Sequence, residues 1–225
     1  MPRITSQSFF LGLDLGQRRD YTAVCVVESA IITLDARNPV SFAWLEEHRL
    51  AIAGLHRFPL DTPYPEIVQY VSRSVCAEPL RHNSTLAIDA TGVGYAVYDM
   101  FRETRLPVRT LFGVQITSGE HVSRDASFER IPRKLLLHNL YAATVNRAYC
   151  IAEGLPWAPD FLRELACLEV RMDDAGNESV GPAKRSGHDD LVFAAALALW
   201  FATRPECKGT RFNGPVPYAY SPHHL

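Results

Sequence analysis

Three acidic stretches, far apart in the chain, carry the residue types that divalent-metal chemistry needs. Asp14 lies in LGLDLGQRRDYTAV, Asp89 in LAIDATGVGYAV, and the pair Asp189 and Asp190 in SGHDDLVFAAALALW. Carboxylates that gather together raise one another's pKa and destabilise a fold, and a bound cation relieves that repulsion. Hard oxygen ligands select Mg²⁺ or Mn²⁺ over Zn²⁺. We therefore predict that these four aspartates bind metal and act in catalysis.

The chemistry that such a site performs is hydrolysis of a nucleic-acid backbone. Two Mg²⁺ or Mn²⁺ ions about 4 Å apart activate the attacking water and stabilise the leaving oxygen of a phosphodiester. Mg²⁺ keeps much of its water and accepts substrate phosphate oxygens as its remaining ligands. We expect two ions when the substrate is bound.

The first two acids are expected at the ends of buried strands. An apolar run at 9–13 precedes Asp14, and Gly16 follows it, which is typical of a strand that opens into a turn. Residues 85–88 predict a second strand, and the glycines of TGVG after Asp89 allow a tight turn into a helix. Both carboxylates should then lie at one end of the sheet.

The third acidic stretch differs, because it is expected in the first turn of a helix. Residues 191–201 are apolar almost all round, which indicates a buried helix. Asp189 and Asp190 stand where that helix begins.

Each acid taken alone also has an explanation without metal chemistry. Asp14 can simply terminate a strand. Asp89 before TGVG suits an ordinary strand-to-helix turn, or a phosphate-binding loop without the lysine of a P-loop. Asp189 and Asp190 suit a helix start through capping and the helix dipole, whatever the function. The combination of three such stretches favours the metal site.

The elements between these stretches predict an α/β fold with a mixed five-stranded sheet. Three antiparallel strands precede two parallel ones, helices flank the sheet, and a hairpin around 174–177 comes before the last helix. The segment at 31–47 suits either a hairpin extension or a loop, and 113–130 is expected to be irregular. The strands are expected at 9–13, 21–28, 50–58, 85–89 and 108–112. The helices are expected at 63–77, from the TGVG turn to about 105, and at 132–150, 158–167 and 191–201.

Length and composition indicate one domain at 1–203, followed by a flexible tail at 204–225. A chain of 225 residues that is 47% hydrophobic can bury a good core, whereas its last residues are rich in Pro, Gly and Tyr. The net charge of −2 argues against a globally basic nucleic-acid-binding protein, so such contacts must come from local patches and metal ions.

The cellular setting is predicted to be a cytoplasm. The five cysteines show no Cys-x-x-Cys pair, which favours reduced thiols over disulfides or a zinc site. No apolar run reaches membrane-spanning length, and the first eight residues lack the apolar core of a signal peptide.

Taken together, several segments of the chain resemble the nuclease domain of bacteriophage terminase large subunits. The resemblance covers roughly 9–203 and rests on an ordered set of segments: GLDLGQRRDYTAV, HRFPLDTPYPEIV, AIDATGVGYAV, IPRKLLLHNL and GHDDLVFAAALALW. It implies an RNase H-like fold and a two-metal endonuclease that cuts concatemeric double-stranded viral DNA during genome packaging. It also implies that a phage or prophage encodes the protein and that it works in a bacterial host cell.

The same resemblance implies roles for individual residues. Asp14, Asp89 and one of Asp189 and Asp190 match the metal-binding carboxylates; we expect both members of the pair near the metals, with Asp189 ahead. Asp20 matches an additional acid that supports these ligands or binds a weaker metal, and it equally suits a solvated turn.

Further residues around the acids are candidates on chemical grounds. His188 suits a hydrogen bond to a metal-bound water or a phosphate, or simply a place beside a helix cap. Cations are needed to hold the phosphate, and each candidate also suits a solvated surface charge. The candidates, in order of preference, are Lys184, Arg185, Arg18, Arg19 and Lys134.

One departure from the family is large, because the chain has no Gly-x-x-x-x-Gly-Lys-Ser/Thr motif. It therefore lacks the packaging ATPase, and its expected partners besides DNA are a separate packaging ATPase, a small terminase subunit or a portal. An excised domain, a split gene product and a prophage remnant all remain open.

Three other functions compete with the terminase nuclease. One is a Holliday-junction resolvase on the same fold, and a second is a catalytically idle packaging adaptor. The third is a sugar-kinase-like or actin-like ATPase, because DLG before a hairpin also suits phosphate binding. The chain is too short for the two lobes of that last class.

Overall fold

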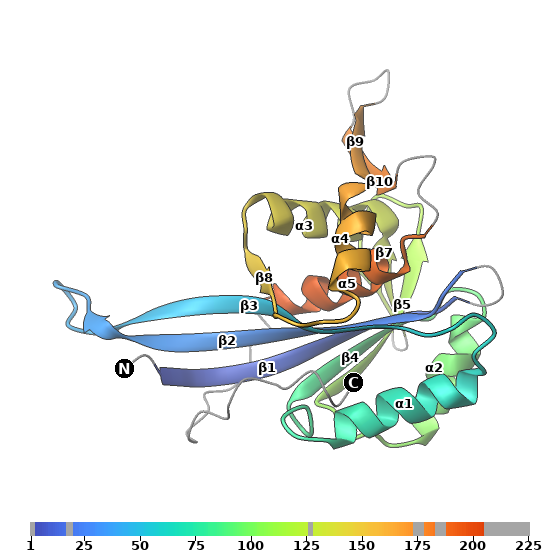
Figure 1. The fold of residues 1–225 in the computed structure, drawn as a ribbon, viewed down its shortest axis with the longest axis horizontal. Coiled ribbons are helices and arrows are strands. Elements are labelled where there is room, and N and C mark those ends of the chain that lie inside the picture. The colour runs from blue at the N-terminus through green and yellow to red at the C-terminus, as the bar shows by residue number, and fades with distance from the viewer. Residues whose placement is uncertain (1–2, 17–19, 126–127, 173–177, 183–187, 205–225) are drawn as a thin grey trace.

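A mixed central sheet, covered by helices on both faces, forms the body of the protein (Figure 1). A computed structural model of the chain describes residues 3–16, 20–125, 128–172, 178–182 and 188–204. In these ranges the strands are β1 (Arg3–Asp14), β2 (Ala23–Arg37), β3 (Trp44–Arg57), β4 (Ser84–Asp89), β5 (Thr110–Thr117), β6 (Ser123–Arg124), β7 (Phe128–Pro132), β8 (Tyr149–Ile151), β9 (Leu168–Met172) and β10 (Glu178–Pro182). The helices are α1 (Tyr64–Cys76), α2 (Gly94–Glu103), α3 (Arg133–Val145), α4 (Ala158–Ala166) and α5 (Asp190–Ala202).

The centre of the sheet has the strand directions that the sequence predicts. Strands β1, β2 and β3 pair antiparallel, β4 lies parallel to β1, and β5 lies parallel to β4. The expected number of five strands is wrong, however. Within the described residues the sheet has eight strands in the order β6-β7-β5-β4-β1-β2-β3-β8.

The additional strands come from segments whose local pattern is weak. Residues 113–130 were expected to be irregular, but β5 continues to Thr117 and β7 pairs parallel with it. At the other edge, the helix expected to reach residue 150 ends at Val145. Arg147 adopts a φ of 51°, which breaks the helix, and β8 then pairs parallel with β3. Both segments are strands because a neighbouring strand offers unpaired backbone groups.

Two hairpins extend from the body. Strands β2 and β3 continue through 31–47, so this segment is a hairpin extension, and it projects well beyond the helices (Figure 1). Its tip exposes Val40 and Phe42, which are 86% and 70% accessible. Strands β9 and β10 pair antiparallel and form the hairpin expected before the last helix. The turn predicted at 174–177 lies outside the described residues, as does the tail predicted at 204–225 apart from Arg204.

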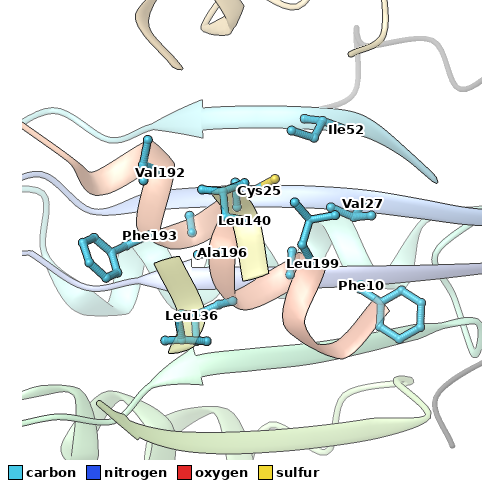
Figure 2. Packing of buried hydrophobic residues seen from close by; sticks show 14 of the residues in the cluster. Phe10, Cys25, Val27, Ile52, Leu136, Leu140, Val192, Phe193, Ala196 and Leu199 are labelled. Carbon is cyan, nitrogen blue, oxygen red and sulfur yellow. The ribbon is translucent and has the colours of Figure 1, made fainter. Parts of the chain in front are cut away.

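The side chains of β1 alternate between two cores, as a strand covered on both faces requires. Phe10 belongs to a core with the buried residues of α3 and α5, whereas Phe9 and Leu11 belong to a core with α1 and α2. Figure 2 shows the first core, in which Phe10, Cys25 and Val27 of the sheet face Ala196 and Leu199 of α5.

Helix α5 packs with its backbone directly against β1. A Cβ atom at Gly12 would lie 2.1 Å from the carbonyl oxygen of Ala194 and 2.7 Å from the backbone nitrogen of Ala198. Only glycine fits this approach. Asp14 follows Gly12 by two residues and Asp190 precedes Ala194 by one helical turn, so the contact brings two acidic stretches together.

Two other features of the described chain concern its helices and its cysteines. None of its helices combines the length and the apolar character that crossing a bilayer takes. The thiols of Cys25, Cys76, Cys150 and Cys167 are free.

Candidate active site

The predicted carboxylates meet at one cavity of about 390 Å³, where the ends of β1 and β4 face the start of α5. The residues lining this cavity include all five predicted acids, namely Asp14, Asp20, Asp89, Asp189 and Asp190.

Two parallel strands place Asp14 and Asp89 beside each other. Leu13 of β1 is in register with Ile88 of β4, so the residues that end the two strands are neighbours. The backbone N–H of Thr91 donates to Oδ1 of Asp89 at 2.8 Å, which holds the turn after β4. A Cβ at Gly94 would lie 2.0 Å from the carbonyl oxygen of Asp89, so α2 can begin this close only because residue 94 is glycine.

The start of α5 supplies the other two carboxylates. Asp189 is the N-cap residue, and its Oδ2 accepts a hydrogen bond of 2.8 Å from Arg133, the first residue of α3. The Arg133 guanidinium also lies 3.9 Å from the centre of the Phe193 ring. Asp190 is the first helical residue, and its side chain is only 4% exposed.

The electrostatics of the cavity favour a bound cation. Burial raises the pKa of Asp14 well above its usual value, and the charges of Asp89, Asp190 and Asp189 raise it further, while Arg133 opposes them. Burial also raises the pKa of Asp89, against hydrogen bonds from Thr91. The pKa of Asp190 rises to about 6, chiefly through burial, although Arg57 and His188 lower it. The carboxylates therefore repel one another, and a cation would relieve the repulsion.

These oxygen donors fit a hard divalent ion such as Mg²⁺ or Mn²⁺. Within the described ranges, no three His, Cys, Asp or Glu side chains already form a group that could hold a metal ion. The acids share a cavity, and arginines contact Asp189 and Asp190.

The remaining predicted residues have more varied positions. Asp20 is exposed at the cavity. His188 packs edge-on against Tyr21, with ring centroids 4.7 Å apart, and its Nδ1 lies 3.9 Å from Oδ2 of Asp190. Lys134 pairs with Glu120 and does not line the cavity. The other predicted cations, Arg18, Arg19, Lys184 and Arg185, lie outside the described residues.

Three charged residues at the site escaped the sequence analysis. Arg133 stands next to the predicted Lys134. Which of the two side chains faces the cavity depends on where β7 ends, and the sequence does not show that position. Arg57 and Glu164 form a buried ion pair near the start of α5. The one sequence signal for Arg57 is a charged residue in the apolar run LAIAGLHRF.

Comparison with solved structures shows which known fold has this strand order. The large terminase nuclease of thermophilic phage G20c, solved with bound magnesium, has 18% identity and a TM-score of 0.51; the match covers 86% of this chain and 81% of that chain.

A second solved structure gives the same result. The large terminase nuclease domain of Thermus phage P74-26 has 19% identity and a TM-score of 0.51, with 85% of this chain and 78% of that chain covered. No protein-family model matches the sequence, and no curated protein matches it. The fold is thus that of phage large terminase nuclease domains, as the resemblance predicted.

Proposed function

We propose that the protein is a divalent-metal-dependent DNA endonuclease of the terminase type, which cuts viral DNA during genome packaging. The observation that carries this proposal is the cavity where carboxylates from β1, β4 and α5 meet. The likeness to the G20c nuclease with bound magnesium supports the choice of a hard divalent metal.

Asp14, Asp89, Asp189 and Asp190 would hold the metal. When bound, two divalent ions would generate the attacking hydroxide and stabilise the leaving oxygen of the phosphodiester. The chain's own contribution is to fix four carboxylates on three rigid elements. Asp14 and Asp89 end strands and Asp190 begins a helix, and sites built on strands and helices are held more precisely than sites on loops.

Arg133 would hold the phosphate that is cut. It is the only cation among the described residues that line the cavity, and its guanidinium already donates to a carboxylate there. A planar guanidinium can donate two parallel hydrogen bonds to phosphate oxygens, which a lysine cannot. This arginine takes precedence over Lys134, which pairs with Glu120 away from the cavity.

The biological setting follows from the same proposal. The substrate would be double-stranded DNA, and the protein would cut it in a bacterial host cell. The nuclease domain would span 1–203. The sequence has no P-loop motif, so translocation would need an ATPase that these 225 residues do not supply, and a small terminase subunit or portal would complete the assembly.

Nicking of supercoiled plasmid in Mn²⁺ tests the activity, with Asp14→Asn and Asp89→Asn as variants. Asparagine keeps the shape of aspartate and removes a repelling charge, so both variants should fold with at least wild-type stability and lose cleavage by a factor on the order of 10³. Asp99→Asn is the matched control, because Asp99 pairs with Arg102 on α2 and does not line the cavity. Wild-type cutting by Asp14→Asn would refute the proposal.

The phosphate contact has its own test. Arg133→Ala should raise the KM for DNA and lower kcat by a factor on the order of 10², and Arg133→Lys should recover only part of the loss. Lys134→Ala, one residue further along α3, should cut like wild type. Equal losses in the two alanine variants would mean that Arg133 contributes only general surface charge.

Substrate choice separates the terminase type from its competitors. We expect linear and supercoiled duplexes to be cut at least as well as four-way junctions. A strong preference for junctions would favour a resolvase. Absence of Mn²⁺ binding in calorimetry would favour an idle adaptor.

A further inference from the structure

A buried ion pair between Arg57 and Glu164 contacts the first turn of α5. Arg57 ends β3 and Glu164 lies in α4, and their side chains are 9% and 7% exposed. Oε2 of Glu164 accepts hydrogen bonds from the backbone N–H groups of Leu191 at 3.0 Å and Val192 at 3.1 Å. Glu164 therefore caps α5 from a different helix.

This cap replaces the one that the chain would ordinarily make locally. The first N–H groups of a helix need acceptors, and an aspartate at the N-cap position usually provides one. Asp189 occupies that position and makes no side-chain cap hydrogen bond; its carboxylate accepts from Arg133 instead. Because Glu164 satisfies the backbone, Asp189 can face the cavity.

Arg57 balances the charges behind the site. Its Nη2 lies 3.8 Å from Oδ2 of Asp190, and its guanidinium lies 5.0 Å from the Tyr21 ring centre and 5.6 Å from that of Trp157. The guanidinium thus lies near both rings while it pairs with Glu164. Because Arg57 also pairs with Glu164, its positive charge only partly offsets the negative charge of Asp190.

Stability alone is a poor explanation for such a pair. Desolvating two charges costs several kcal/mol per ion, and apolar residues of similar volume often serve the fold equally well or better. The pair does, however, define where the first turn of α5 lies, and that turn carries two of the four site carboxylates.

We propose that Arg57 and Glu164 are positioning residues, which cap and fix the start of α5 so that Asp189 and Asp190 both serve the cavity. This inference rests on the proposed metal-binding function of those aspartates. Supporting groups of this kind change metal affinity or activity by about 10- to 100-fold when they are lost.

Two variants test the proposal. Replacing Arg57→Met together with Glu164→Leu removes both charges and the cap while keeping most of the volume. The double variant should stay folded, lose hydrogen-exchange protection at the amides of Leu191 and Val192, and bind Mn²⁺ at least roughly 10-fold more weakly. Glu164→Gln keeps an acceptor for those amides but leaves Arg57 to oppose a cation at Asp190. It should retain protection and still weaken Mn²⁺ binding.

The matched control is the buried ion pair at the other end of the same helix. Arg204, just beyond the end of α5, pairs with Glu129 of β7, whose side chain is 4% exposed, and neither residue lines the cavity. Glu129→Gln should lower the melting temperature and leave Mn²⁺ affinity unchanged. If the Arg57–Glu164 pair were also purely structural, Glu164→Gln would give the same result.

The outcomes are distinct. A folded double variant with protected amides and wild-type Mn²⁺ affinity would overturn the proposal. If that variant does not fold, Glu164→Gln decides alone, and wild-type Mn²⁺ affinity in it is then the negative result. Failure of the wild-type protein to bind Mn²⁺ and cut DNA would instead refute the proposed function, and the amide protection would still report on the cap.

Discussion

Replacing Gly12 by alanine should damage both the fold and the site, because β1 touches the backbone of α5 at this residue. The added Cβ would lie 2.1 Å from the carbonyl oxygen of Ala194 and 2.9 Å from Cβ of Leu197. Neither atom can rotate away, since both belong to a helix that is buried on nearly every side. The helix must therefore move as a body.

The size of the effect follows from these distances. Ordinary contact begins at 3.4 Å, so α5 must retreat by about 1.3 Å in a core packed to crystal-like density. Overpacking costs about 1–3 kcal/mol, and we expect the upper end because the clash involves backbone. For a chain of this length, a cost of about 3 kcal/mol lowers the melting temperature by about 6–12 °C. A misplacement of about 1 Å in the site also costs about 10²-fold in rate.

Thermal unfolding, Mn²⁺ calorimetry and plasmid nicking measure the three effects. Cleavage is compared per folded molecule, at a temperature where Gly12→Ala is fully folded, so that lost stability does not count as lost activity. Gly119→Ala is the control, because its Cβ would meet only Oγ1 of Thr117, at an ordinary 3.6 Å. If Gly12→Ala melts and binds Mn²⁺ like the wild type, α5 does not press on β1 as described.

Two further predictions concern the acids and the hairpin. In EDTA the free energy of unfolding should fall as pH rises from about 4 to 6. Burial raises the pKa of Asp190 to about 6 and also raises that of Asp14. In this pH range the folded state therefore holds protons that the unfolded chain has released. At pH 7 saturating Mg²⁺ should restore stability, by about 2.7 kcal/mol at 100 times Kd; melts in which Mg²⁺ has no effect would contradict this. Phe42→Ala should change the free energy of unfolding by less than about 0.5 kcal/mol, because Phe42 is 70% exposed. Phe10→Ala should cost about 3–5 kcal/mol, because Phe10 is 1% exposed. Equal losses for the two variants in chemical denaturation would contradict this difference.

The sequence predicts the parts of the fold that depend on local patterns. The apolar run before Asp14 and the TGVG turn after Asp89 predict two strand ends, and the parallel register of β1 with β4 brings those ends together. Helix α5 is also predicted, because residues 191–201 are apolar almost all round, as in a buried helix. These elements carry all four metal-binding candidates.

The rest depends on contacts between distant segments. Strand β7 contains FERIP, which carries a glutamate and an arginine and lacks a clear alternation, yet it pairs because β5 offers an open edge. The sequence predicts only that Glu164 lies on an amphipathic helix. Nothing near it in the sequence indicates that it accepts hydrogen bonds from the amides of Leu191 and Val192. Whether Arg133 or Lys134 reaches the cavity is likewise decided by where β7 ends and α3 begins.

The arginines divide the acids of the cavity into two groups. Asp189 contacts Arg133 and Asp190 lies near Arg57, whereas no ion pair within the described residues involves Asp14 or Asp89. Burial raises the pKa of both carboxylates in the second group, as it does for Asp190, but no ion pair within the described residues offsets it there, so a cation would relieve the most repulsion at Asp14 and Asp89. The first group already has partial countercharges, which let the helix start fold beside the other acids. A site assembled in this way would tolerate its own charge before a metal binds, and it would keep its strongest attraction for the metal at the two strand ends.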